Sequence, residues 1–213
     1  MKTDELIAIL ASNEARTDRN ALRLRALGLL AVGVFLSFLM VYFLLHLNPA
    51  LGTIVSSLWF WVRFAFVASL AGLSWWTLRR LGKPGLAGKV RWWPLLLPFA
   101  ALAALATALL MRAPGDARVA MLLGVSWQVC SMTIALVSLP LFVAAIAIVR
   151  SFAPIRLRFT GATLGLFAGA MAALVYTLHC PELSPAFLVV WYSLGMLIPA
   201  VIGALIGERL LRW

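Results

Sequence analysis

The chain has 213 residues, of which 64% are hydrophobic and 12% are charged, and its mean hydropathy is +1.02. A soluble domain is typically about 45–50% apolar and about 25% charged, so this composition excludes an ordinary soluble protein. The formal net charge of +11 does not indicate nucleic-acid binding, because the basic residues lie between apolar runs and there set membrane orientation.

The first 26 residues form the one sizeable polar segment, predicted to be a separate cytoplasmic unit ahead of a membrane domain of residues 27–213. Asp4 lies in the first turn of a predicted helix, where an acidic side chain suits the helix dipole. Leu6, Ile7 and Leu10 fall on one face at helical spacing. This helix fits either an anchor on the lipid surface or a peptide that docks into a partner's groove.

Six apolar runs follow, each about as long as a bilayer core of about 30 Å requires. They cover residues 27–46, 54–78, 92–111, 121–149, 159–179 and 186–206. Fifteen of the eighteen Lys and Arg residues lie on the side of the N-terminus, and two lie in the opposite connections. We therefore predict an all-α, polytopic bundle of six transmembrane helices with cytoplasmic N- and C-termini.

Arg63 is the one charged residue embedded in a run, in the sequence WFWVRF. We expect its side chain to snorkel to the outer interface beside Trp59 and Trp61. No acidic residue lies in the middle of a run, which disfavours an ion-coupled transporter. The chain also contains no nucleophile motif, P-loop or paired carboxylates, so it is not predicted to be an enzyme.

Both cysteines fall at one predicted depth. Cys130 lies nineteen residues before Val149, a helical rise of about 28 Å. Cys180 lies twenty-one residues after Phe159, a rise of about 32 Å. Both thiols are therefore predicted near the outer face, within reach of a signal from outside the cell.

The two histidines, His46 and His179, are predicted at the same face. Free cysteines and histidines at helix ends are often purely structural. Two functional alternatives are a reversible disulfide between Cys130 and Cys180, and a soft-metal site of both thiolates with His179 or His46. No spacing matches a tight metal motif, so no resident cofactor is predicted, and transient heavy-metal binding stays open.

Small residues recur in the last two runs, at a spacing that lets helix backbones approach closely: Gly161, Gly165, Gly169, Gly203 and Gly207. Prolines inside the fourth and sixth runs predict kinks at Pro140 and Pro199.

The opening KTDELIAILA, the cysteine in the fourth run, and the segments HCPELSPAFLVVWY and GALIGERLLRW together resemble the NrsF family of negative regulators of sigma F. These are inner-membrane anti-sigma factors for extracytoplasmic-function sigma factors. The resemblance implies that residues 1–26 hold such a sigma factor at the membrane, without direct contact to nucleic acid. It also implies that Cys130 and Cys180 perceive metal or oxidative stress and cause release.

Within the N-terminal segment, we predict that Asp4, Leu6, Ile7 and Leu10 form the contact face for the sigma factor. The segment lacks the His/Cys zinc motif of soluble zinc-binding anti-sigma proteins, so no such zinc fold is expected. Two other functions stay open, namely a membrane thiol-redox protein and a small transporter or scaffold. The sequence predicts neither the inducer nor the oligomeric state.

Overall fold

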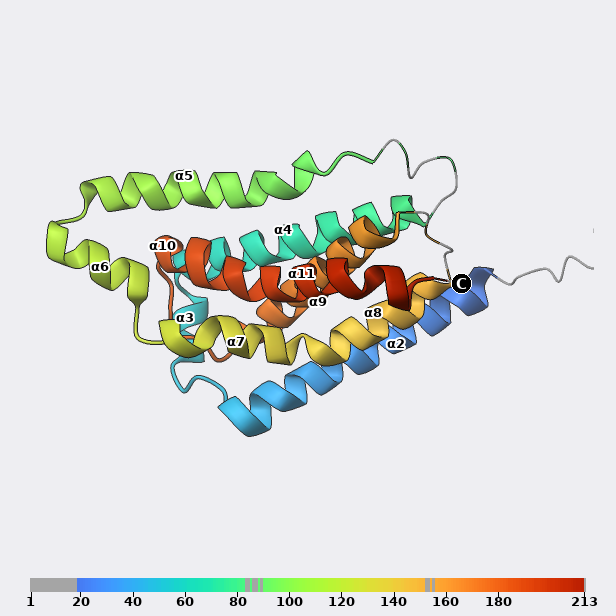
Figure 1. Cartoon of the computed structure of the whole chain (residues 1–213). Coiled ribbons are helices and arrows are strands. Elements are labelled where there is room, and N and C mark those ends of the chain that lie inside the picture. Colours follow the sequence, from blue (N-terminus) through green and yellow to red (C-terminus); the bar gives the residue numbers. More distant parts are fainter. Residues whose placement is uncertain are drawn as a thin grey trace, which may run out of the picture.

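The computed structural model describes residues 19–212, except residues 83, 84, 86, 87, 89, 152, 153 and 155. Within these ranges the chain folds into helices and contains no strand (Figure 1). The predicted contact residues Asp4, Leu6, Ile7 and Leu10 lie outside the described residues.

The described residues form eight longer helices: α2 (Arg19–Met40), α4 (Leu58–Leu81), α5 (Leu97–Arg112), α6 (Gly115–Leu123), α7 (Trp127–Val137), α8 (Leu139–Arg150), α9 (Leu157–Tyr176) and α11 (Ser193–Leu210). Short helical segments extend or connect them: η1 (Val41–Leu45), α3 (Leu51–Val55), η3 (Trp93–Leu96), α10 (Pro185–Phe187) and η4 (Leu188–Tyr192).

Six helical stretches are long and apolar enough to cross a membrane: Asn20–Leu45, Leu58–Leu81, Trp93–Arg112, Gly115–Arg150, Leu157–Tyr176 and Pro185–Leu210. Each contains most of one predicted run, so the prediction of six long apolar helices is confirmed. Such an arrangement fits a multi-pass membrane protein. The first helix already begins at Arg19 and runs without a break past residue 26, where the polar segment was predicted to end.

The fourth stretch is divided into three helices. The first, α6, ends at Gly124, whose φ of +57° is one that side-chain-bearing residues rarely adopt. The chain breaks again at Ser138, two residues before the kink predicted at Pro140, which lies in the first turn of α8. Proline is favoured there because it lacks the N–H that a helix interior needs. By contrast, Pro199 lies inside the continuous helix α11.

Residues 112–120 were expected to be a connection between spans. This expectation is wrong from residue 115 onward, since α6 begins at Gly115 directly after Pro114. A proline just before the first helical residue is compatible with helix formation there, because the initial N–H groups have no intrahelical partner.

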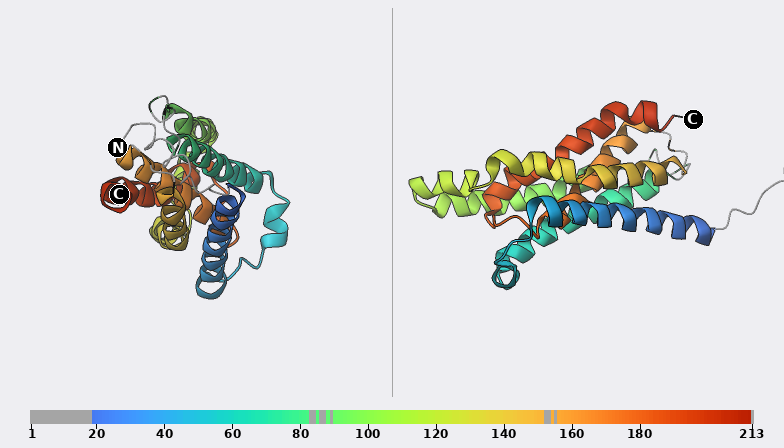
Figure 2. Two further views of the ribbon diagram at one scale, coloured as in Figure 1. Left: turned by 90° about the vertical axis from the view of Figure 1, so that its right-hand side faces the viewer. Right: turned by 90° about the horizontal axis from the view of Figure 1, so that it is seen from below.

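Helix α9 lies at the centre of the bundle and contacts α2, α4, α7, α8 and α11 (Figures 1 and 2). It packs most extensively against α11. Gly161 faces Gly203, and Gly165 faces the backbone of Pro199 and Ala200. Only hydrogen atoms separate the two backbones at these positions, which confirms the predicted close approach.

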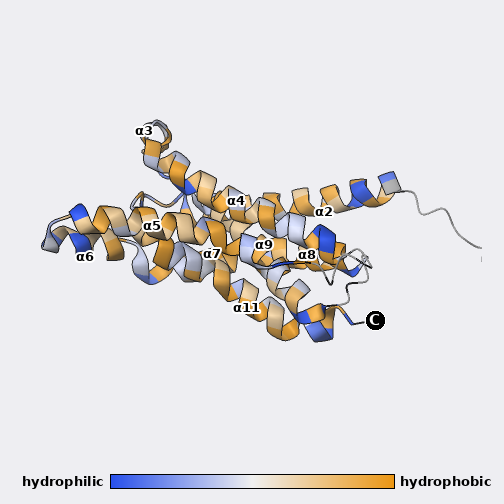
Figure 3. Cartoon of the chain, turned by 90° about the horizontal axis from the view of Figure 1, so that it is seen from above, coloured by the Kyte–Doolittle hydropathy of each residue, from blue (hydrophilic) through white to orange (hydrophobic). Residues whose placement is uncertain are grey.

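The described chain begins and ends at the same end of the bundle, while α3, α6 and α10 lie at the opposite end (Figure 1). Apolar residues line the lengths of the helices, and hydrophilic ones gather towards the ends (Figure 3). The turn between α9 and α10 therefore lies opposite the end where the described chain begins and ends. This turn, residues 177–184, positions the candidate site.

Candidate functional site

The 177–184 turn begins where α9 stops at Tyr176. The N–H groups of His179 and Cys180 both donate to the carbonyl of Tyr176, at 3.0 Å and 3.1 Å, and so wind the chain into one last turn. Pro181 follows, and its missing N–H prevents the helix from continuing. The Cys180 side chain is thereby directed into the bundle, where it is completely buried.

The two thiols meet inside the bundle. Cys130, on α7, is also completely buried, and both cysteines are free. Their side chains lie within hydrogen-bonding reach of each other, although fifty residues separate them in the sequence. The prediction that they share one depth therefore identified two residues that the fold brings into contact.

Two tyrosines enclose this thiol pair. The rings of Tyr176 and Tyr192 lie 5.8 Å apart, and both side chains are buried. Tyr176 is within hydrogen-bonding reach of Cys130, and Tyr192 is within reach of Cys180. Sequence reasoning missed both tyrosines because tyrosine is common near helix ends in membranes.

The groups around Cys180 make its thiol more acidic. The hydrogen bond with Cys130 lowers the pKa of the Cys180 thiol below its ordinary value, and the Tyr192 hydroxyl, the Glu182 N–H and Arg63 act in the same direction. Burial acts against this shift and does not outweigh it. Since the thiolate is the nucleophile and the metal ligand, the lowered pKa favours Cys180 as the thiol of the pair that loses its proton.

Arg63 does not snorkel to the interface, and that expectation is wrong. Its side chain is completely buried and turns towards the 177–184 turn. Nη1 donates to the carbonyl oxygens of Cys180 at 2.9 Å and Glu182 at 2.8 Å, while Nη2 donates to that of Thr177 at 3.0 Å. Thr177 caps the end of α9 and the other two carbonyls lie in the turn beyond it, so the guanidinium binds backbone oxygens that no helix uses.

Glu182 connects the turn to the break in the fourth span. Its Oε1 accepts a hydrogen bond of 2.6 Å from the N–H of Val125, which directly follows Gly124. Nearby, the Ser184 hydroxyl donates to the carbonyl of Met121 at 2.8 Å. The turn is therefore bonded to the junction between α6 and α7, the helix that carries Cys130.

His179 connects the same turn to the end of the first span. Its Nδ1 lies 2.8 Å from the carbonyl oxygen of His46, a residue with the unusual φ of +62°. The N–H of Asn48 donates to the carbonyl of Leu178 at 3.1 Å. His46 thus meets His179 through its backbone. No group of three or more His, Cys, Asp or Glu side chains able to hold a metal ion occurs within the part of the chain that the structure describes.

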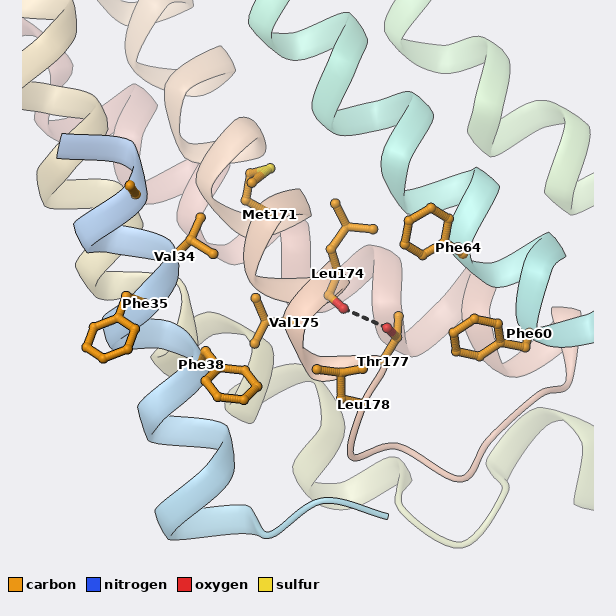
Figure 4. A pocket seen from close by; sticks show the side chains of 11 residues that line it. Val34, Phe35, Phe38, Phe60, Phe64, Met171, Leu174, Val175, Thr177 and Leu178 are labelled. Atoms are coloured by element: carbon orange, nitrogen blue, oxygen red, sulfur yellow. Dashed lines mark hydrogen bonds between the residues drawn. The ribbon is translucent and has the colours of Figure 1, made fainter. Parts of the chain in front are cut away.

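An apolar groove of about 660 Å³ lies beside the turn, between α2, α4 and α9 (Figure 4). Phe38 of α2 lies on one side of it and Phe60 and Phe64 of α4 lie on the other, with Leu174 at its back. This lining contains no Cys, His, Asp or Glu side chain, so the thiol pair is not part of the groove.

This chain is similar to known proteins over its whole length. Residues 10–213 match the family described as negative regulator of sigma F. A protein of Azospira oryzae named probable anti-sigma-F factor NrsF is 38% identical over the full length of both chains. The anti-sigma-F factor NrsF of Caulobacter vibrioides is 34% identical, also over the full length of both chains. No solved structure matches this chain. The chain therefore belongs to the family of negative regulators of sigma F.

Proposed function

We propose that the chain is an inner-membrane anti-sigma factor that holds an extracytoplasmic-function sigma factor and releases it when Cys130 and Cys180 react with a metal ion or an oxidant. The observation that carries this proposal is the contact between two buried, free thiols at the end of the bundle opposite the termini. Thiolates bind soft metals and form disulfides, so one thiol pair suits both kinds of signal.

The proposed orientation puts both termini in the cytoplasm and the thiol pair near the outer face. Its support is the excess of Lys and Arg at the end where the described chain begins and ends. In this orientation residues 1–26 face the sigma factor, with Asp4, Leu6, Ile7 and Leu10 as contact residues. A reactive pair near the outer face would meet a stress agent before it enters the cell.

The sensing half predicts that a chain with Cys130→Ser and Cys180→Ser holds its sigma factor during stress. The test is co-purification with the cognate sigma factor, before and after cells receive cadmium or peroxide. The unaltered chain should lose most of its sigma factor, and the double variant should keep it, because serine neither binds soft metals nor forms disulfides. Thr133→Ser, on the same helix as Cys130, is the matched control and should respond normally. Release from the double variant would refute sensing by the cysteines.

The binding half predicts that removal of residues 2–18 abolishes retention of the sigma factor. This truncation ends before α2, which begins at Arg19, and so leaves the membrane helices intact. Leu6→Asp with Ile7→Asp should have the same effect by placing charges on the predicted apolar face, whereas Asn13→Asp should not. Undiminished co-purification with the truncated chain would show that the sigma factor binds elsewhere.

A second candidate function gains support from the same contact. A membrane thiol-redox protein needs two cysteines close together, and the wide spacing of Cys130 and Cys180 in the sequence had argued against it. A regulatory family fits the prediction that the chain is not an enzyme. Catalytic turnover of the purified chain with a quinone or a thioredoxin-like protein would favour the redox function instead.

A further inference from the structure

Arg63 is the one charged side chain that is completely buried among the described residues. Its three hydrogen bonds go to neutral carbonyl oxygens, its Nε has no partner, and its other contact is the ring of Phe60, 5.3 Å away. The single ion pair within the described ranges is Arg158–Glu208, elsewhere on the surface. A buried guanidinium without a carboxylate partner is expensive, so its place depends on the carbonyls that surround it.

The three carbonyls are arranged around one thiol. They belong to Thr177, Cys180 and Glu182, so Arg63 binds the residue that carries the sulfur and residues on both sides of it. No other side chain donates to the carbonyl of Cys180 in the described structure. The guanidinium therefore fixes the backbone path that brings this sulfur against Cys130.

The same turn is bonded to three other parts of the bundle. Glu182 accepts from Val125 ahead of α7, His179 contacts the carbonyl of His46, and Leu178 accepts from Asn48. The first of these links leads to the helix of Cys130, and the other two lead to the end of the span that continues from the N-terminal segment. A shift of the turn would therefore displace both the helix that carries Cys130 and the end of the first span.

We propose that Arg63 is a positioning residue of the sensing site, which clamps the 177–184 turn in the conformation that retains the sigma factor. The inference rests on the proposed function for its output, the sigma factor, but not for its geometry. A reaction at Cys180 changes the contacts of a residue that Arg63 holds directly. Loss of the clamp is then the step that carries this change from the thiols to the rest of the bundle.

The first test measures positioning alone. Full-length protein in detergent micelles is oxidised with copper–phenanthroline, so that the two thiols lose two protons and two electrons to dioxygen and form the Cys130–Cys180 disulfide. Arg63→Gln, which lacks the charge and the reach to hold three carbonyls, should slow this reaction at least about tenfold, equivalent to about 1.4 kcal/mol. Arg63→Lys keeps the charge and should restore part of the rate. Arg79→Gln, on the exposed surface of the same helix, is the control.

The second test measures output. Arg63→Gln should release the sigma factor without stress, and should do so even when combined with Cys130→Ser and Cys180→Ser, since the clamp acts after the thiols. Size-exclusion chromatography identifies variants that fold, and Arg63→Lys replaces Arg63→Gln if the latter does not. A folded clamp variant that forms the disulfide at the normal rate, or that retains the sigma factor, overturns the inference. If stress releases the sigma factor from the variant that carries Cys130→Ser and Cys180→Ser and keeps Arg63, the proposed sensing is refuted instead. The failure of the sensing and the failure of the clamp are therefore distinct results.

Discussion

Replacing Gly165 with leucine is expected to prevent α9 from packing against α11 and to destabilise the whole bundle. A Cβ atom at Gly165 would lie 2.7 Å from the Cα of Ala200 and closer still to the carbonyl oxygen of Pro199. Both neighbours are backbone, so no side-chain rotation relieves the collision. Overpacking of a core typically costs about 1–3 kcal/mol and more where the structure cannot yield, so we expect a loss above about 3 kcal/mol.

The measurement is thermal unfolding of the purified protein in detergent. A loss of that size lowers the melting temperature by more than about 6–12 °C for a chain of this length. Gly72→Leu is the matched control, because a Cβ at Gly72, on α4, meets nothing within 4 Å. If the Gly165→Leu and Gly72→Leu variants had the same melting temperature, the close contact between α9 and α11 would be contradicted.

The second large effect is expected at Gly124, where the chain breaks between α6 and α7. Its φ of +57° and ψ of −162° lie in a region that is essentially restricted to glycine, and occupation of that region by another residue costs about 1–3 kcal/mol. A Cβ there would also lie 2.6 Å from the carboxyl carbon of Glu182 and displace its hydrogen bond to Val125. Gly124→Ala should therefore destabilise the protein and loosen α7.

Gly115→Ala provides the comparison for Gly124→Ala, because the two glycines flank the same helix. Gly115 is the first residue of α6 and has open space around it, so alanine there should be neutral or slightly stabilising. The two variants are compared by thermal unfolding and by the rate of Cys130–Cys180 disulfide formation. Equal melting temperatures for both would contradict the strained turn at Gly124.

The six long helices and the depth of the thiols could be predicted from the sequence because both depend on local properties. Continuous apolar runs set the number of helices, and the fixed rise of a helix converts a residue count into a depth. Cys130 and Cys180 could therefore be matched in depth without any knowledge of the helix order around the bundle. That the two thiols are in contact could be learned only from the folded structure.

The role of Arg63 could not be predicted in the same way. Its acceptors are backbone carbonyls 114 to 119 positions further along the chain. Every residue has a backbone carbonyl, so a hydropathy pattern cannot indicate which ones bind Arg63. The break at Gly124 was missed for a related reason, since Gly124 and Val125 continue an apolar run. The sequence identified Glu182 as an acidic residue of the turn, but its hydrogen-bond partner could not be predicted because it is the backbone N–H of Val125.

The distance between Arg63 and its acceptors also has a consequence for biosynthesis. The ribosome adds about 5–20 residues per second, so roughly 6 to 24 s pass between the synthesis of Arg63 and that of the three carbonyls. During this interval the second helix carries a cation whose binding site does not exist, and its long side chain must reach towards the headgroups and water. In the proposed topology the nascent chain passes through a state with Arg63 at the interface, and the thiol pair proposed to sense stress assembles only after α9 and the 177–184 turn have been made.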